Sequence, residues 1–118
     1  MNKALRVPDY LGHILEAIER IEEYVSDMDE MAFLASKLVQ DAVIRNIEII
    51  GEASNNIQRV HPAFAAQHDN IPWQVMYAMR NRVSHGYDKV DFEIIWRTIH
   101  GDLPALYRLV QQVRGNGD

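Results

Sequence analysis

Hydrophobic residues recur at three- and four-residue intervals along most of this chain, which is the spacing of one face of an α-helix. The first such stretch follows Asp9, a residue type that caps helix N-termini, and ends near Ser26. Its apolar positions are Leu11, Ile14, Leu15, Ile18, Ile21 and Val25. The sequence has no strand-like alternation, internal repeat or low-complexity segment. The pattern therefore predicts an all-α fold.

A second helix is predicted from about Asp29 to about Arg59, because this stretch lacks proline and Gly51 is its one internal helix breaker. Its apolar residues cover an arc of roughly 160°, wider than the stripe of about 100° on a helix packed on one side. They are Met31, Ala35, Val39, Ala42, Val43, Ile47, Ile49, Ile50, Ala53 and Ile57. We therefore expect this helix to have two neighbours and the protein to be dimeric.

Two further main helices complete the prediction. Pro62 ends the long helix, residues 63–69 form a short helical or irregular connector, and the next helix begins near Pro72. The last helix follows Asp91, and Pro104 should kink or break it because its ring crowds the carbonyl four residues earlier.

The predicted architecture is thus an up-and-down bundle of four main helices, with room for a fifth short one. It forms a single domain over residues 1–114, followed by a disordered tail at 115–118.

Composition agrees with one small domain. The chain has 118 residues, of which 47% are hydrophobic, enough to bury roughly two-thirds of its unfolded surface in a single core. It has neither a long apolar run nor a charged leader, so we expect a soluble cytoplasmic protein with no membrane contact. There is no cysteine, and the five histidines show no paired ligand spacing, so neither a metal nor another cofactor is expected.

The charge balance argues against bulk electrostatic binding of nucleic acid. Twelve Lys and Arg stand against seventeen Asp and Glu, a formal net charge of −5. A protein that binds nucleic acid through bulk charge is usually basic. Any such contact must therefore be local.

The most informative polar residues are Arg80, His85 and Tyr87, which lie close together. Positions 80 and 85 would stand about 140° apart on an ideal helix. They converge only if the helix ends between them, and Gly86 is a suitable stop. His85 would then lie at a helix C-terminus, where the dipole favours the imidazolium. Arg80 stays charged and suits a phosphate, so the pair predicts metal-free cleavage of a phosphate ester.

Residues 79–91 contain an Arg-x4-His-x-Tyr pattern and resemble the signature of the HEPN superfamily, specifically its HepT-type ribonuclease toxins. The resemblance covers nearly the whole chain. Residues 42–53 are similar to the long second helix of the family, 71–73 to the entry of the motif helix, and 95–104 to the last helix.

The resemblance implies a metal-independent endoribonuclease of a type VII-like toxin–antitoxin pair. Two motif helices would meet in a homodimer, with Arg80 stabilising the phosphate and His85 moving protons. Asn81 would hold the backbone or the RNA substrate, for which tRNA and mRNA are the first candidates. A cognate nucleotidyltransferase antitoxin of the minimal type (MNT) would transfer AMP to Tyr87.

The polar side of the long helix allows two interpretations. It is either a solvated face, or Arg45, Glu48 and Glu52 line the wall of a cleft opposite the motif. In the second case Arg45 lies near the substrate phosphate and a glutamate orients Arg80.

Two rival functions also remain open. One is a non-catalytic HEPN partner, or nucleotide-binding subunit, of a nucleotidyltransferase complex. The other is a helical dimer that serves only as an interaction scaffold.

Overall fold

The computed structural model describes residues 5–85 and 89–116 of the chain. Tyr87, the predicted acceptor of AMP, lies outside these residues. The elements in chain order are α1 (Val7–Tyr24), α2 (Glu30–Ala35), α3 (Lys37–Val60), α4 (Pro62–Gln67), α5 (Trp73–His85) and α6 (Phe92–Asn116). The described residues contain four long helices, two short ones and no strand, so the all-α prediction is confirmed.

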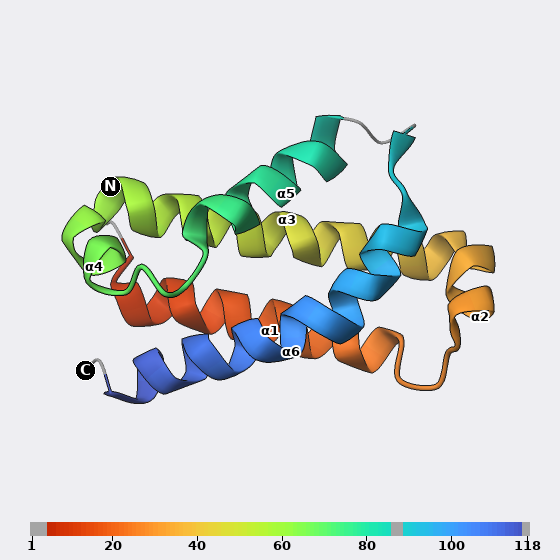
Figure 1. The fold of residues 1–118 in the computed structure, drawn as a ribbon, viewed down its shortest axis with the longest axis horizontal. Helices are drawn as coiled ribbons and strands as arrows, with labels where there is room; N and C mark the ends of the chain where they lie inside the picture. The colour runs from red at the N-terminus through yellow and green to blue at the C-terminus, as the bar shows by residue number, and fades with distance from the viewer. Residues whose placement is uncertain (1–4, 86–88, 117–118) are drawn as a thin grey trace.

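The long helix α3 lies at the centre of the bundle. It packs on α1 along one side and on α5 along another, while α1 also packs on α6. Figure 1 shows α5 crossing obliquely over α3, and α6 crossing α1 in the lower part of the view. The core between these helices is aliphatic. Its fully buried side chains include Leu11, Ile14, Ile18, Ile21, Val43, Ile57, Ile71, Ile99 and Val110.

The wide apolar arc of α3 is therefore explained within one chain. Val43, Ile47, Ile50 and Ile57 are all buried in the core of the single chain. The prediction of two neighbours is correct, but both neighbours are helices of the same molecule. The arc by itself thus gives no support to a dimer.

The predicted helix from 29 to 59 is wrong in one respect, because it is broken at Ser36 into α2 and α3. The Ser36 hydroxyl accepts a hydrogen bond from the backbone N of Val39 at 3.2 Å and so caps α3. Gln40 then donates to the backbone oxygens of Phe33 and Leu34, both at 3.0 Å. The break turns α2 so that the buried Phe33 reaches α6, where its ring centroid lies 5.4 Å from that of Trp96.

Other boundaries also differ from expectation. α1 starts at Val7, and Asp9 accepts a hydrogen bond from the backbone N of Arg6 inside the first turn. α6 is not broken at Pro104, because Leu103 and Leu106 are buried on either side and hold it on the bundle. Residues 115 and 116 belong to α6 rather than to a disordered tail, and 117–118 lie outside the described residues. None of the described helices has both the length and the apolar character needed to cross a membrane.

Candidate active site where α3 meets α5

The start of α5 is fixed by Trp73, which is buried against the end of α4. Its indole N–H is shared between the backbone oxygens of Ala65, at 3.3 Å, and His68, at 3.1 Å. Further along α5, Met76 and Val83 are buried as well. With α5 anchored in this way, its polar residues Arg80 and Ser84 contact side chains of α3.

Gly51 lets the two helices approach closely beside Arg80. A Cβ at position 51 would stand 2.9 Å from the carbonyl oxygen of Met76 and closer still to the Cβ of Arg80. No side chain can occupy that space without moving α5. In the sequence, Gly51 is evident only as a helix breaker. A glycine inside a long helix costs about 1 kcal/mol relative to alanine, so its presence there is itself a signal of close packing.

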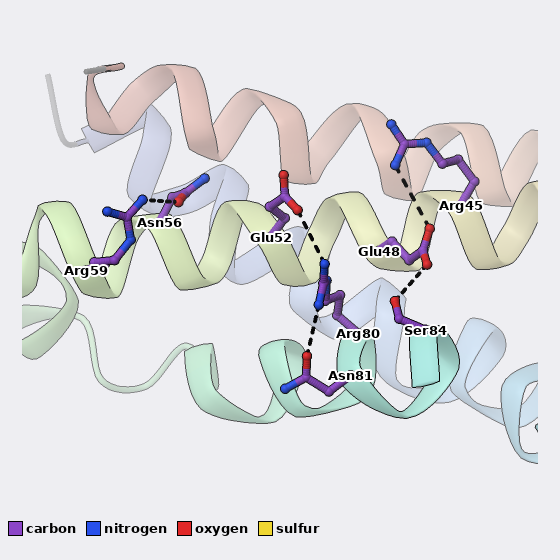
Figure 2. A network of polar contacts seen from close by, with 8 residues as sticks. All are labelled: Arg45, Glu48, Glu52, Asn56, Arg59, Arg80, Asn81 and Ser84. Atoms are coloured by element: carbon purple, nitrogen blue, oxygen red, sulfur yellow. Dashed lines mark hydrogen bonds and ion pairs between the residues drawn. The ribbon is translucent and has the colours of Figure 1, made fainter. Parts of the chain in front are cut away.

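Arg80 is held by a carboxylate of α3 and by its own neighbour on α5 (Figure 2). Its Nη2 lies 3.7 Å from Oε2 of Glu52, and its Nη1 donates to Oδ1 of Asn81 at 3.1 Å. The Arg80 side chain is 29% exposed and that of Glu52 is 67% exposed. A glutamate of the long helix therefore contacts Arg80, the arrangement expected for a residue that orients it.

A second contact joins the same two helices one turn away. The hydroxyl of Ser84 donates to Oε2 of Glu48 at 2.7 Å, and Oε1 of Glu48 lies 4.0 Å from Nη1 of Arg45 (Figure 2). Arg45 itself is 71% exposed. It is thus tied to Glu48 and has no described contact with the motif helix.

Arg45, Glu48 and Glu52 line one hollow, as the cleft interpretation expects, but its opposite wall is different. That wall is formed by Tyr10 and His13 of α1. The motif helix contacts the two glutamates from the other side, through Ser84 and Arg80. The three residues therefore do not face the motif across one cleft within a single chain.

The helix does not end between Arg80 and His85, contrary to the expectation from sequence, because α5 continues through His85. Val83 is buried and Ser84 is bonded to α3, which together keep this turn helical. Positions 80 and 85 therefore stay about 140° apart around the helix axis. No group of three or more His, Cys, Asp or Glu side chains within residues 5–85 and 89–116 is arranged to hold a metal ion.

The family of this chain follows from its similarity to known proteins. The family model described as "HepT-like: Ribonuclease HepT-like" matches residues 14–113, which contain the whole of α3 and α5 and most of α1 and α6. The chain belongs to the HepT-like ribonuclease family. The HepT-like match extends well beyond the motif helix and covers residues of all four long helices.

Proteins named as ribonucleases are similar to this chain over most of its length. "Probable ribonuclease HepT" of Thermococcus cleftensis is 43% identical over 106 residues, covering 90% of this chain and 94% of that protein. "Putative RNase MJ1380" of Methanocaldococcus jannaschii is 35% identical over 107 residues, covering 91% and 95%. In the longer "Gamma-glutamylcyclotransferase and putative RNase MJ0434" of the same organism, the match at 43% identity covers 46% of the protein. No solved structure matches the chain.

In this HepT-like protein, the geometry leaves Arg80 able to bind an anion. A guanidinium has five N–H donors. One N–H group of Arg80 donates to Asn81, and another faces Glu52. The Arg80 side chain is still 29% exposed. The remaining donors suit the oxygens of a phosphate, which a planar fork can bind in pairs.

Proposed function

We propose that this protein is the ribonuclease toxin of a type VII-like toxin–antitoxin pair and cleaves RNA without a metal ion. The observation that carries the proposal is a HepT-like chain whose motif arginine is half-buried and held by Glu52 beside Gly51. Arg80 stabilises the negative charge that develops on the scissile phosphate. His85 moves the protons.

The chemistry is internal transfer followed by release of the leaving strand. An imidazole accepts the proton of the RNA 2′-hydroxyl as its oxygen attacks the adjacent phosphorus. The bond from phosphorus to the 5′-oxygen breaks, and an imidazolium gives that oxygen a proton. The products are a 2′,3′-cyclic phosphate and a 5′-hydroxyl, and atoms and charge balance without any further reactant.

A homodimer supplies the second histidine that this scheme can use. Positions 80 and 85 remain about 140° apart on the continuous α5, so one chain does not bring them together by ending its helix. A second copy packed on α5 would place two arginines and two histidines along one cleft. Asn81, bonded to Arg80 at 3.1 Å, then supports the arginine.

Regulation is proposed to act at Tyr87, two residues after His85. A partner nucleotidyltransferase of the MNT type transfers AMP to the phenol. Each AMP unit adds a phosphate anion that can occupy the free donors of Arg80, and it also blocks RNA entry sterically.

The cleavage proposal is tested with the purified protein and a pool of tRNA and mRNA. Arg80→Ala and His85→Ala should each lower the cleavage rate by about 10²–10⁴ while leaving the melting temperature unchanged. Arg20→Ala, which removes an exposed arginine paired with Glu16 on α1, is the matched control and should keep full activity. Products should carry a cyclic phosphate, and added chelator should have no effect. An inert wild-type protein would favour the non-catalytic partner instead.

The regulation proposal is tested by co-expression with the neighbouring nucleotidyltransferase and measurement of intact mass. We expect increments of one or more AMP units that are absent in Tyr87→Phe. Neutralisation of the toxin without a mass change, or unchanged modification of Tyr87→Phe, would contradict it.

A further inference from the structure

The hydroxyl of Ser84 does not donate to a carbonyl of its own helix, unlike the hydroxyls of Ser54 and Thr98. Ser54 donates to the backbone oxygen of Ile50 at 2.7 Å and also lies 3.5 Å from the sulfur of Met76 on α5. Thr98 donates to the backbone oxygen of Ile94 at 2.9 Å. Donation to the carbonyl four residues earlier is the usual choice inside a helix. Ser84 instead donates across to the carboxylate of Glu48 on α3, at 2.7 Å. Its side chain therefore serves the contact between two helices.

This hydrogen bond is of the strong kind. The donor is a hydroxyl, the acceptor is a carboxylate, and the distance of 2.7 Å is short. The Glu48 side chain is 29% exposed, whereas that of Glu52, the partner of Arg80, is 67% exposed. Exposed ion pairs contribute little because water screens them. Of the two contacts that glutamates of α3 make with α5, the one through Ser84 is therefore the firmer.

The hydrogen bond from Ser84 to Glu48 lies at the C-terminal end of α5, next to the motif histidine. α5 is packed chiefly on α3, and Val83 is buried near the C-terminal end of α5. The bond from Ser84 to Glu48 comes one residue later, and His85 follows directly. It therefore fixes the last turn of α5, the turn that carries the motif histidine.

The two contacts also set the register of the helices. Glu48 and Glu52 are one turn apart on α3, and their partners Ser84 and Arg80 are one turn apart on α5 (Figure 2). A slide of one helix along the other would break both contacts together.

We propose that Glu48 and Ser84 are positioning residues that hold the last turn of α5 on α3 and so fix the backbone of His85 relative to Arg80. The proposal rests on the ribonuclease function proposed above. Reaction rates fall steeply when catalytic groups are misplaced, by about 10² for a shift near 1 Å. A hydroxyl that touches no substrate can therefore control turnover.

The kinetic test compares Ser84→Ala with Ser84→Thr, which keeps a hydroxyl. Ser84→Ala should lower kcat by about 10- to 100-fold with little change in KM, and Ser84→Thr should restore most of it. Glu48→Gln keeps an acceptor oxygen and should retain more activity than Glu48→Ala. Thr98→Val is the control, because it removes a buried hydroxyl that bonds only within its own helix. Unchanged kcat in Ser84→Ala, or equal loss in the alanine and threonine variants, would overturn the proposal.

A second readout does not depend on cleavage. Hydrogen exchange of the backbone amides of residues 82–85 should be faster in Ser84→Ala and Glu48→Ala than in the wild type or in Thr98→Val. If exchange at these amides is unchanged, the positioning role is wrong even when RNA is cleaved. If the wild type cleaves no RNA but exchange responds as expected, the ribonuclease function fails and the role in holding α5 stands.

Discussion

Gly51 of α3 lies directly against the Cβ of Arg80 of α5, and there is no space for a methyl group between them. The position of the motif arginine thus depends on a glycine 29 residues earlier in the sequence. This contact lets Glu52, the next residue, reach the guanidinium at 3.7 Å. The backbone of α3 and the candidate active site are therefore parts of one packing arrangement.

Gly51→Ala should destabilise the protein and lower RNA cleavage together. The added Cβ would collide with Arg80 and with the backbone oxygen of Met76, so α5 must move. Overpacking of this kind costs about 1–3 kcal/mol, partly offset by the better helix propensity of alanine, about 1 kcal/mol. Chemical denaturation and a cleavage assay would measure both effects. Gly101→Ala is the control, since no atom lies within 4 Å of a Cβ there, and it should be neutral or stabilising.

Glu52→Gln should leave stability nearly unchanged but reduce cleavage. The Glu52 side chain is 67% exposed, so its ion pair with Arg80 should contribute less than about 1 kcal/mol to folding. Loss of the charge would still free the guanidinium to rotate, and kcat should fall by less than the roughly 10² expected for a displacement near 1 Å. Faster cleavage in this variant would show instead that Glu52 competes with the RNA phosphate for Arg80.

The dimer is predicted to form over α5 and α6. A hollow of about 330 Å³ lies between α3, α5 and α6, lined by Val75, Met79 and Leu106 among other apolar residues. Val75 is 61% exposed. Light scattering at micromolar concentration should give twice the chain mass of 13.6 kDa, and Val75→Asp should return a monomer. Leu38→Asp changes a residue that is 81% exposed and does not line this hollow, so it should stay dimeric.

Tyr107 should make the stability of the bundle depend on alkaline pH. Its hydroxyl donates to Oε2 of Glu19 at 2.6 Å and so ties α6 to α1. That hydrogen bond, then burial and the charges of Glu19 and Glu22, raise the pKa of Tyr107 above its ordinary value of 10.0. The folded state thus favours the protonated phenol. The stabilisation is fully present below pH 10.0 and is lost as the pH rises through the folded-state pKa.

Denaturation of Tyr107→Phe across this alkaline range checks the prediction. The variant should lose about 0.5 kcal/mol or less at neutral pH, because the pair is exposed to solvent. It should also lack the part of the alkaline destabilisation that comes from this phenol. An identical pH dependence in both proteins would rule out the contribution of Tyr107.

The sequence by itself determined the helices and the family. Apolar residues at three- and four-residue spacing form a local signal, so residues such as Ile14, Ile18 and Ile21 predict a buried helical face without any knowledge of its partner. The motif residues likewise stand close together in the chain, and the resemblance built on them is confirmed by the family match over residues 14–113.

The tertiary structure alone decided how these helices meet. The break at Ser36 accompanies the contact of Phe33 with Trp96, and the continuation of α5 through His85 accompanies the bond from Ser84 to Glu48. The residues in these two contacts are 36 and 63 positions apart in the sequence. Helical periodicity does not encode where two helices cross. For the same reason the sequence left Glu48 and Glu52 either on a solvated face or on a cleft wall where one of them orients Arg80. The close approach at Gly51 makes them the partners of the motif helix.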